Sequence, residues 1–133
     1  MEKQHALQQL EQLQKKLYAI HYACSAMNLD ADTVAPKNTS EGRGVALGVL
    51  AGEEQQLMIC PETRALLDEL DRQKDELDLL HRREVEELRR RCDQLTRIPA
   101  EEYIAYSELV NKAGDVWHKA KEKDDFAMFC PHA

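Results

Sequence analysis

The stretch Leu29-Asp-Ala-Asp-Thr-Val-Ala-Pro-Lys-Asn-Thr-Ser-Glu-Gly-Arg-Gly44 separates two segments that have the residue patterns of helices. It is rich in residues that favour turns, and Pro36 disfavours helical geometry at Ala35. We therefore predict a loop that begins at Leu29, with Ser40 as the N-cap of the following helix. A generic helical bundle needs no such loop, so this stretch tells the most about which fold the chain adopts.

The segment before the loop has an apolar residue every three or four positions, which places these side chains on one stripe of a helix. This spacing predicts a helix from Glu2 to about Asn28. Its expected buried side consists of Leu7, Leu10, Leu13, Leu17, Ile20, Cys24 and Met27.

The segment after the loop carries Gly44, Gly48 and Gly52 at a strict spacing of four residues. In a helix this spacing leaves one face without side chains, although each glycine costs about 1 kcal/mol relative to alanine. We therefore expect close packing of this face against a neighbouring helix. A phosphate-binding loop is the weaker alternative, because no strand precedes these glycines.

Three further helices follow, and the first and the last of them have proline and acidic residues in the first turn. Cys60-Pro61-Glu62 begins a helix that runs to about Arg72, and the next helix runs from about Asp75 to Arg97. Its expected buried side consists of Leu79, Leu80, Val85, Leu88, Cys92 and Leu95. The last helix begins at Ile98-Pro-Ala-Glu-Glu102 and fades near Asp124; its expected core stripe is Tyr103, Tyr106, Val110, Ala113 and Trp117, flanked by Leu109 and Val116. The chain is predicted to be all-α, with about five helices in an antiparallel or irregular bundle.

Charged residues cover the outer face of the segment 82–91 at helical spacing. Arg82 with Glu86, Arg83 with Glu87, Glu86 with Arg90 and Glu87 with Arg91 are all pairs of the i,i+4 type. We interpret the triplet Arg89-Arg90-Arg91 as a solvated face that neutralises itself rather than as an anion site.

The composition limits the partners. The chain has 133 residues, which fits one helical domain (1–133) or the N-terminal fragment of a larger protein. Its net charge of -7 argues against nucleic acid and anionic membranes as partners. The polar N-terminus lacks the pattern of a secretory signal, and no apolar run is long enough to span a bilayer, so we expect a cytoplasmic protein. The four cysteines are widely separated and are expected to be reduced.

No catalytic, metal-binding or cofactor-binding residue is assigned from the sequence. His81-Arg-Arg-Glu84 resembles an inverted zinc motif, but Val85 stands where the second ligand is needed. His21 and Cys24 could share a helix face, yet two ligands do not close a site. The motif HExxH is absent, and no serine lies in a strained GxSxG turn.

The remaining signal is the order of several short segments along the whole chain. These segments are Leu29-Asp30, Thr33-Val-Ala-Pro36, Glu41-Gly-Arg43, Arg82-Arg-Glu-Val-Glu-Glu-Leu88, Ile98-Pro-Ala-Glu-Glu-Tyr103, Val116-Trp117 and Asp125-Phe-Ala-Met-Phe129. Their order and spacing resemble the N-terminal region of carboxypeptidase Taq family zinc metallocarboxypeptidases. Leu29 and Ala35 depart from the commoner family pattern, which has Trp and Met at these positions.

The resemblance implies an all-helical enzyme that uses zinc or another divalent metal to remove C-terminal residues from peptides. It also implies that HExxH lies downstream of this region. We therefore expect the chain to form helices that wall or cover the peptide groove, to be inactive alone, and to meet peptide substrate only in the complete enzyme; a homo-oligomer is left open. The alternative is a free-standing helical module that binds a partner protein.

Overall fold

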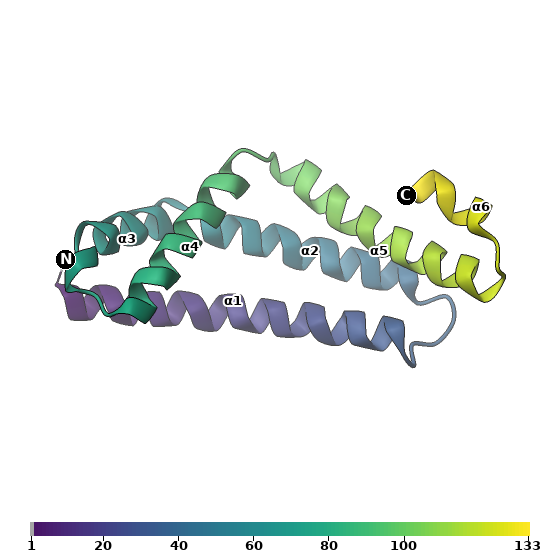
Figure 1. Ribbon diagram of the computed structural model, residues 1–133, viewed down its shortest axis with the longest axis horizontal. Coiled ribbons are helices and arrows are strands. Elements are labelled where there is room, and N and C mark those ends of the chain that lie inside the picture. The colour runs from purple at the N-terminus through teal and green to yellow at the C-terminus, as the bar shows by residue number, and fades with distance from the viewer. Residues whose placement is uncertain (1) are drawn as a thin grey trace. The chain divides into compact units, whose positions relative to one another are not determined.

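The computed structural model describes residues 2–133, and this part of the chain contains helices and no strand. The helices are α1 (Lys3–Asp32), α2 (Ser40–Ile59), α3 (Pro61–Arg72), α4 (Leu79–Thr96), α5 (Ala100–Glu122) and the short α6 (Phe126–Phe129), joined by the 3-10 helices η1 (Lys74–Glu76) and η2 (Cys130–His132) (Figure 1). The predicted all-α class and the five long helices are confirmed. No helix among residues 2–133 has the length and apolarity needed to cross a membrane.

The chain divides into two compact units. The first contains the residues up to His21 together with Glu53–Pro99, and the second contains Tyr22–Gly52 together with Ala100–Ala133. Most of the buried apolar side chains belong to the first unit: Ala6, Leu10, Leu13, Leu17, Met58, Leu66, Leu67, Leu70, Leu77, Val85, Cys92 and Leu95. In the second unit the buried apolar side chains are those of Leu47, Ala51 and Ala120.

The connection between α1 and α2 is shorter than the sequence suggested. The prediction that the loop begins at Leu29 is wrong, because α1 continues to Asp32 and its exposed aspartates lie on the solvated side of the helix. The Thr33 hydroxyl donates to the carbonyl of Leu29 at 2.6 Å, and the backbone N–H of Ala35 donates to Asp30 O at 2.9 Å. These bonds terminate α1 just before Pro36.

The start of α2 also differs by one residue from the prediction. Asn38 has a φ of 66°, a left-handed conformation that asparagine tolerates better than most residues. The carbonyl of Thr39 accepts the first helical bond, from the N–H of Arg43 at 3.1 Å. Thr39 therefore occupies the N-cap position, and Ser40 is the first residue of the helix.

The glycine face of α2 packs closely against α5 inside the second unit, as predicted. A Cβ atom added to Gly48 would lie 2.9 Å from Glu108 Oε1 and 3.3 Å from Ile104 Cγ2. An added Cβ at Gly52 would lie 3.0 Å from Ile104 Cδ1. The contacts are made by side chains of α5 rather than by its backbone.

The stripe of α5 that the sequence suggested as buried is so only in part, since Tyr103, Ala113 and Val116 are half-buried and its other members are exposed. Tyr106, Val110 and Trp117 are 63%, 51% and 43% exposed, and Leu109 is 55% exposed. Because a helix advances by about 100° per residue, Ile104 lies nearly opposite the centre of this stripe. The side of α5 around Ile104 faces the glycines of α2. The glycines of α2 thus allow close packing of the Ile104 side of α5, while much of the apolar stripe remains exposed.

The boundaries of α3 and α4 follow local capping. Pro61 lies in the first turn of α3 as predicted, and this helix ends at Arg72. The predicted start of the next helix near Asp75 is wrong, because Asp78 caps α4 and the helix begins at Leu79. Val85, Cys92 and Leu95 are buried as expected, and Leu88 is half-buried. Leu79 and Leu80 are 68% and 66% exposed, contrary to prediction, and Leu77 is buried before the helix begins.

Candidate functional site

A groove of about 470 Å³ lies between α3 and α4 in the first unit. The residues from α3 follow a spacing of three and four positions, as do those from α4, so each set lies on one helix face. The lining residues are Arg64, Leu67, Asp68, Arg89, Cys92, Asp93, Thr96 and Arg97.

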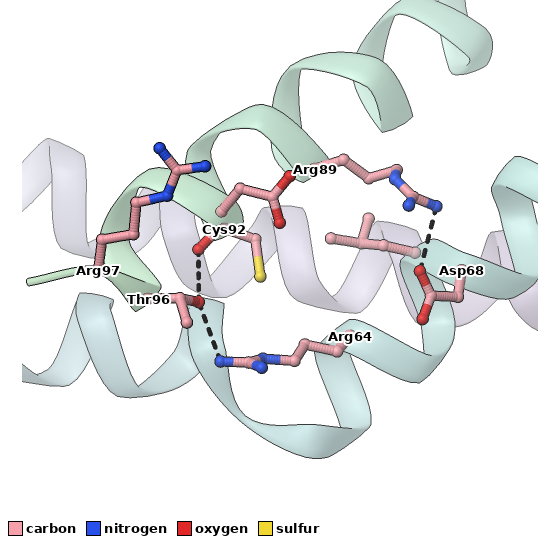
Figure 2. Close-up of a pocket in the computed structure, with 8 residues that line it drawn as sticks. Arg64, Asp68, Arg89, Cys92, Thr96 and Arg97 are labelled. Atoms are coloured by element: carbon pink, nitrogen blue, oxygen red, sulfur yellow. Dashed lines mark hydrogen bonds and ion pairs between the residues drawn. The ribbon is translucent and has the colours of Figure 1, made fainter.

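The floor of the groove is apolar and its rim is polar. Leu67 and Cys92 are buried, with exposed fractions of 1% and 5%. The Arg64 guanidinium donates from Nε to Ile59 O and from Nη2 to Thr96 Oγ1, each at 2.9 Å. The Thr96 hydroxyl in turn donates to Cys92 O at 2.7 Å. Figure 2 shows this chain of bonds linking α3 to the last turn of α4.

The arginine triplet of α4 does not form the self-neutralised face that the sequence suggested. Arg89 reaches α3, where its Nη1 lies 3.1 Å from Asp68 Oδ1 and 3.2 Å from Asp71 Oδ2. Only Arg90 pairs within its own helix, with Glu87, and this bond lowers the pKa of the Glu87 carboxyl and raises the pKa of Arg90. The i,i+4 partners named from the sequence are replaced by i,i+3 pairs and by contacts with other helices.

Arg91 joins a cluster around the buried carboxylate of Glu54. Glu54 is 7% exposed, and its Oε1 binds both Arg91 Nη2 and His21 Nε2, the latter at 2.9 Å. The Arg91 guanidinium therefore compensates the charge that burial would otherwise make costly, and the ring of His21 adds a hydrogen-bond contact. The imidazole of His21 is engaged with a carboxylate instead of belonging to a group of metal ligands.

The other histidine considered as a ligand has a structural role. His81 lies in the first turn of α4, where its backbone N–H donates to Asp78 Oδ1 at 2.9 Å and its Nδ1 lies 2.8 Å from Asp78 Oδ2. The bond from the backbone N–H is the main reason that the pKa of Asp78 is lowered. Among residues 2–133 no three histidine, cysteine, aspartate or glutamate side chains gather in a way that could hold a metal ion. These residues do not fit a zinc site.

Sequence reasoning missed two buried polar residues of α2, Glu54 and Gln55. Gln55 is fully buried, and its Nε2 donates to Leu95 O at 3.2 Å and to Ile98 O at 2.7 Å. Both residues continue the buried face set by Leu47, Ala51 and Met58, since they lie at the i+7 and i+8 positions from Leu47. That spacing was the available signal, but the surrounding run of polar residues 53–56 hid it.

In the second unit, the start of α2 forms hydrogen bonds with Asn111 of α5. Arg43 donates from Nε to Asn111 Oδ1 and from Nη1 to Thr39 Oγ1, each at 3.3 Å. Asn111 Nδ2 donates to the carbonyl of Ser40 at 2.9 Å. Thr39 and Arg43 therefore hold the start of α2 in place. Asn111 is the hydrogen-bond partner of Arg43 and Ser40 that the sequence did not reveal.

Comparison with known proteins identifies relatives for nearly the whole chain. Residues 9–133 match a family described as "Carboxypeptidase Taq (M32) metallopeptidase". The chain is 33% identical over 114 residues to carboxypeptidase 1 of Bacillus subtilis (strain 168) and 30% identical over 117 residues to thermostable carboxypeptidase 1 of Pyrococcus furiosus. These alignments cover 84% and 88% of this chain but 23% of each relative.

A solved structure has the same fold. The crystal structure titled BsuCP superimposes with a TM-score of 0.90 and 30% sequence identity, covering 96% of this chain and 26% of that one. The chain thus spans about a quarter of the length of the relatives it matches.

Proposed function

This chain belongs to the carboxypeptidase Taq family of metallopeptidases, and we propose that it forms the helical wall or lid of the peptide groove in a metal-dependent carboxypeptidase. The complete enzyme would remove C-terminal residues from peptides with the aid of zinc or another divalent metal. The 133 residues would have no peptidase activity by themselves. Peptide substrate, in this proposal, meets the chain only when the catalytic part is present.

The observation that carries the proposal is the uneven burial of the two units. The second unit exposes ten of the large apolar side chains: Tyr22, Leu29, Val34, Val45, Val49, Tyr106, Leu109, Val110, Trp117 and Phe126. Exposed apolar surface of this extent is typical of an interface with another part of a protein. The relatives have the remaining three quarters of their length to supply that part. The proposal assigns no step of catalysis to residues 2–133, among which no three possible ligand side chains gather to hold a metal ion.

Further properties of the complete enzyme are part of the same proposal. Its location would be cytoplasmic, which the four cysteines support, because none of Cys24, Cys60, Cys92 and Cys130 is in a disulfide and such thiols are typical of reducing compartments. For this chain, nucleic acid and membranes are not expected partners, given its net charge of -7. The enzyme would be able to form a homo-oligomer.

A peptidase assay tests the proposed inactivity. The purified chain is incubated with zinc and with peptides whose C-termini are free, and full-length carboxypeptidase 1 of Bacillus subtilis serves as the positive control. We expect release of C-terminal residues by the control and none by the chain. Robust metal-dependent cleavage by the chain alone would overturn the proposal.

A chimera tests the proposed place of the chain within the enzyme. The region of the Bacillus enzyme that matches this chain, 23% of its length, is replaced by the 133 residues. We expect the chimera to bind metal and to retain peptidase activity, because the helices that it receives have the same fold. A folded, metal-loaded chimera without activity would argue against a groove wall.

The alternative function is a free-standing module that binds a partner protein. The specific observation in its favour is the first unit, which buries its own apolar core. An independent module would be monomeric in light scattering and would protect the amides of α2 and α5 equally well from hydrogen exchange. A groove wall separated from its enzyme would associate and would exchange faster in the second unit.

A further inference from the structure

The exposed side of α5 contains a glycine that the packing of the second unit does not explain. Gly114 lies in the interior of this helix, is exposed, and an added Cβ atom there would meet nothing within 4 Å. A glycine inside a helix destabilises it relative to alanine, and close packing of another element is the usual reason for one. Gly48 and Gly52 of α2 have this reason, because side chains of α5 approach them closely. Among residues 2–133, nothing supplies it at Gly114.

The neighbours of Gly114 on the surface of α5 are large and apolar. Val110 lies four positions before it and Trp117 three positions after it, so the three residues are adjacent on one face of the helix. Both side chains are exposed, and Tyr106 and Leu109 continue the apolar stripe toward the start of α5. Gly114 therefore leaves a gap between large side chains, and the side chains of a second helix fit into gaps of this kind.

The charges at the two ends of α5 favour one direction for such a helix. The first turn of α5 contains Glu101 and Glu102, and its last turn contains Lys119 and Lys121. Acidic residues stabilise the first turn of a helix and basic residues stabilise its last turn. A helix that packs antiparallel to α5 therefore brings opposite charges together at both ends, whereas a parallel helix brings like charges together.

The part of the enzyme outside this chain can supply the helix. Within the second unit, α6 turns back beside the end of α5, where Ala120 is buried, and it leaves the apolar stripe uncovered (Figure 1). The chain spans about a quarter of the length of its relatives, and the solved relative is all-helical.

We propose that a helix from the remaining part of the enzyme packs antiparallel along α5 and crosses it at Gly114, with its side chains between Val110 and Trp117. This inference rests on the proposed function, because the remaining part is the catalytic part of the carboxypeptidase. A second copy of the chain is the competing occupant of this face.

The reactivity of an introduced thiol tests where the helix lies. Val110→Cys is made in the chain, at a concentration low enough to keep it monomeric, and in the chimera with the Bacillus enzyme. Peptide mapping by mass spectrometry follows its reaction with a maleimide and separates it from the native cysteines. We expect the thiol to react at least about tenfold more slowly in the chimera.

Lys112→Cys is the matched control for the thiol. Position 112 is exposed and lies about 200° around the helix from position 110, so its thiol should react equally fast in both proteins. Equal rates for Val110→Cys in the chain and the chimera overturn the proposal. Protection that is lost when the chimera is diluted assigns the face to a second copy and also overturns it.

Gly114→Leu tests the crossing point, because its effect should change sign between the two proteins. In the chain it should raise Tm by about 3 °C, since leucine forms helices better than glycine and the added side chain has open space. In the chimera it should lower Tm by about 2 °C or more, since the side chain would occupy the place of the partner helix. Gly114→Ala is the milder variant if the leucine variant does not fold, and it too should stabilise the chain and not the chimera.

Gly42→Leu is the control for the change of sign, because Gly42 lies in the first turn of α2 and an added Cβ there also meets nothing within 4 Å. It should shift Tm alike in both proteins. An increase in Tm by Gly114→Leu that is as large in the chimera as in the chain overturns the proposed crossing point.

Neither measurement depends on catalysis, so the two proposals fail separately. A chimera that cleaves peptides but leaves Val110→Cys reactive contradicts the helix on α5, while the proposed function stands. A folded chimera that protects this thiol but cleaves no peptide supports the helix and contradicts the groove wall.

Discussion

The side chain of Gln55 links α2 by hydrogen bonds to the end of α4 and the residues just after it. Its amide nitrogen donates to Leu95 O in the last turn of α4 and to Ile98 O just after that helix, while its Oε1 is buried without a hydrogen-bond partner in residues 2–133. The last carbonyls of a helix lack partners within the regular helix pattern, and here Leu95 O accepts from the Ile98 N–H as well as from the side chain of Gln55. The position therefore requires an amide although the helix face around it is apolar.

Replacing Gln55 by leucine should destabilise the protein. Gln55→Leu removes the side-chain donor to Ile98 O and one of the two donors to Leu95 O, and we expect a loss of about 1–3 kcal/mol in the free energy of unfolding. Urea denaturation measures this loss. The control is Gln56→Leu, at the neighbouring exposed position, which should change stability little. Equal losses of unfolding free energy in the two variants would show that the hydrogen bonds of Gln55 do not stabilise the protein.

The cap residue Asp78 should make stability dependent on pH in the acidic range. The backbone N–H and imidazole of His81 lower the pKa of the Asp78 carboxyl below its ordinary value. The unfolded state then binds the proton more readily, so the contribution is fully present above the pKa of the unfolded chain, about 4, and is lost as the pH falls through the lower pKa of the folded state.

Asp78→Asn tests this dependence, because asparagine retains a cap but has no carboxyl to titrate. We expect the difference in unfolding free energy between about pH 7 and pH 3 to be smaller in Asp78→Asn than in the wild type. Asp75→Asn, an exposed position in η1, serves as the control and should leave the difference nearly unchanged. An identical pH profile for wild type and Asp78→Asn would exclude this role of the cap.

At the scale of helices, the packing of α2 on α5 depends on the absence of side chains at the glycines. Gly48→Leu would place atoms where Glu108 and Ile104 now lie, and we expect a loss of about 1–3 kcal/mol in unfolding free energy. Gly114→Leu is the matched control, since a Cβ there meets nothing within 4 Å. Because leucine forms helices better than glycine, that control should be stabilised by up to roughly 1 kcal/mol. Thermal unfolding compares the two, and a stabilised Gly48→Leu would contradict the packing.

The same interface explains which helices could be predicted. The start of α3 and the end of α1 near Pro36 follow from local signals, so they were predicted to within a few residues. The buried side of α5 could not be predicted in this way. Its sequence offers the stripe that contains Tyr106 and an opposite side that contains Ile104, and only the partner helix determines which is buried.

The candidate groove shows the same limit. The spacing of its residues on α3 and on α4 defines two helix faces, but the sequence does not state that these faces meet. Arg89 and Arg91 find their partners Asp68 and Glu54 on other helices, more than twenty residues away along the chain. Local rules for charge pairs cover three or four residues, so they paired Arg91 with Glu87 and named no partner for Arg89.

At the scale of the molecule, the exposed apolar side of α5 should promote association of the separated chain. The residues concerned are Tyr106, Leu109, Val110 and Trp117. We expect light scattering to show a mass that increases with concentration, and the double variant Leu109→Lys, Val110→Lys to reduce this increase. The variant Ala105→Lys, on the same helix at an exposed position, controls for added charge. A chain that stays monomeric at all concentrations would favour the independent module.

The two bonds of Gln55 also have a kinetic consequence. They join residues separated by 40 and 43 positions, whereas the bonds inside a helix join residues four positions apart. The end of α4 can therefore be completed only after the intervening chain, including α3, has brought α2 alongside it. In folding, the last turn of α4 should therefore gain its full set of hydrogen bonds only after the segment between α2 and α4 has closed.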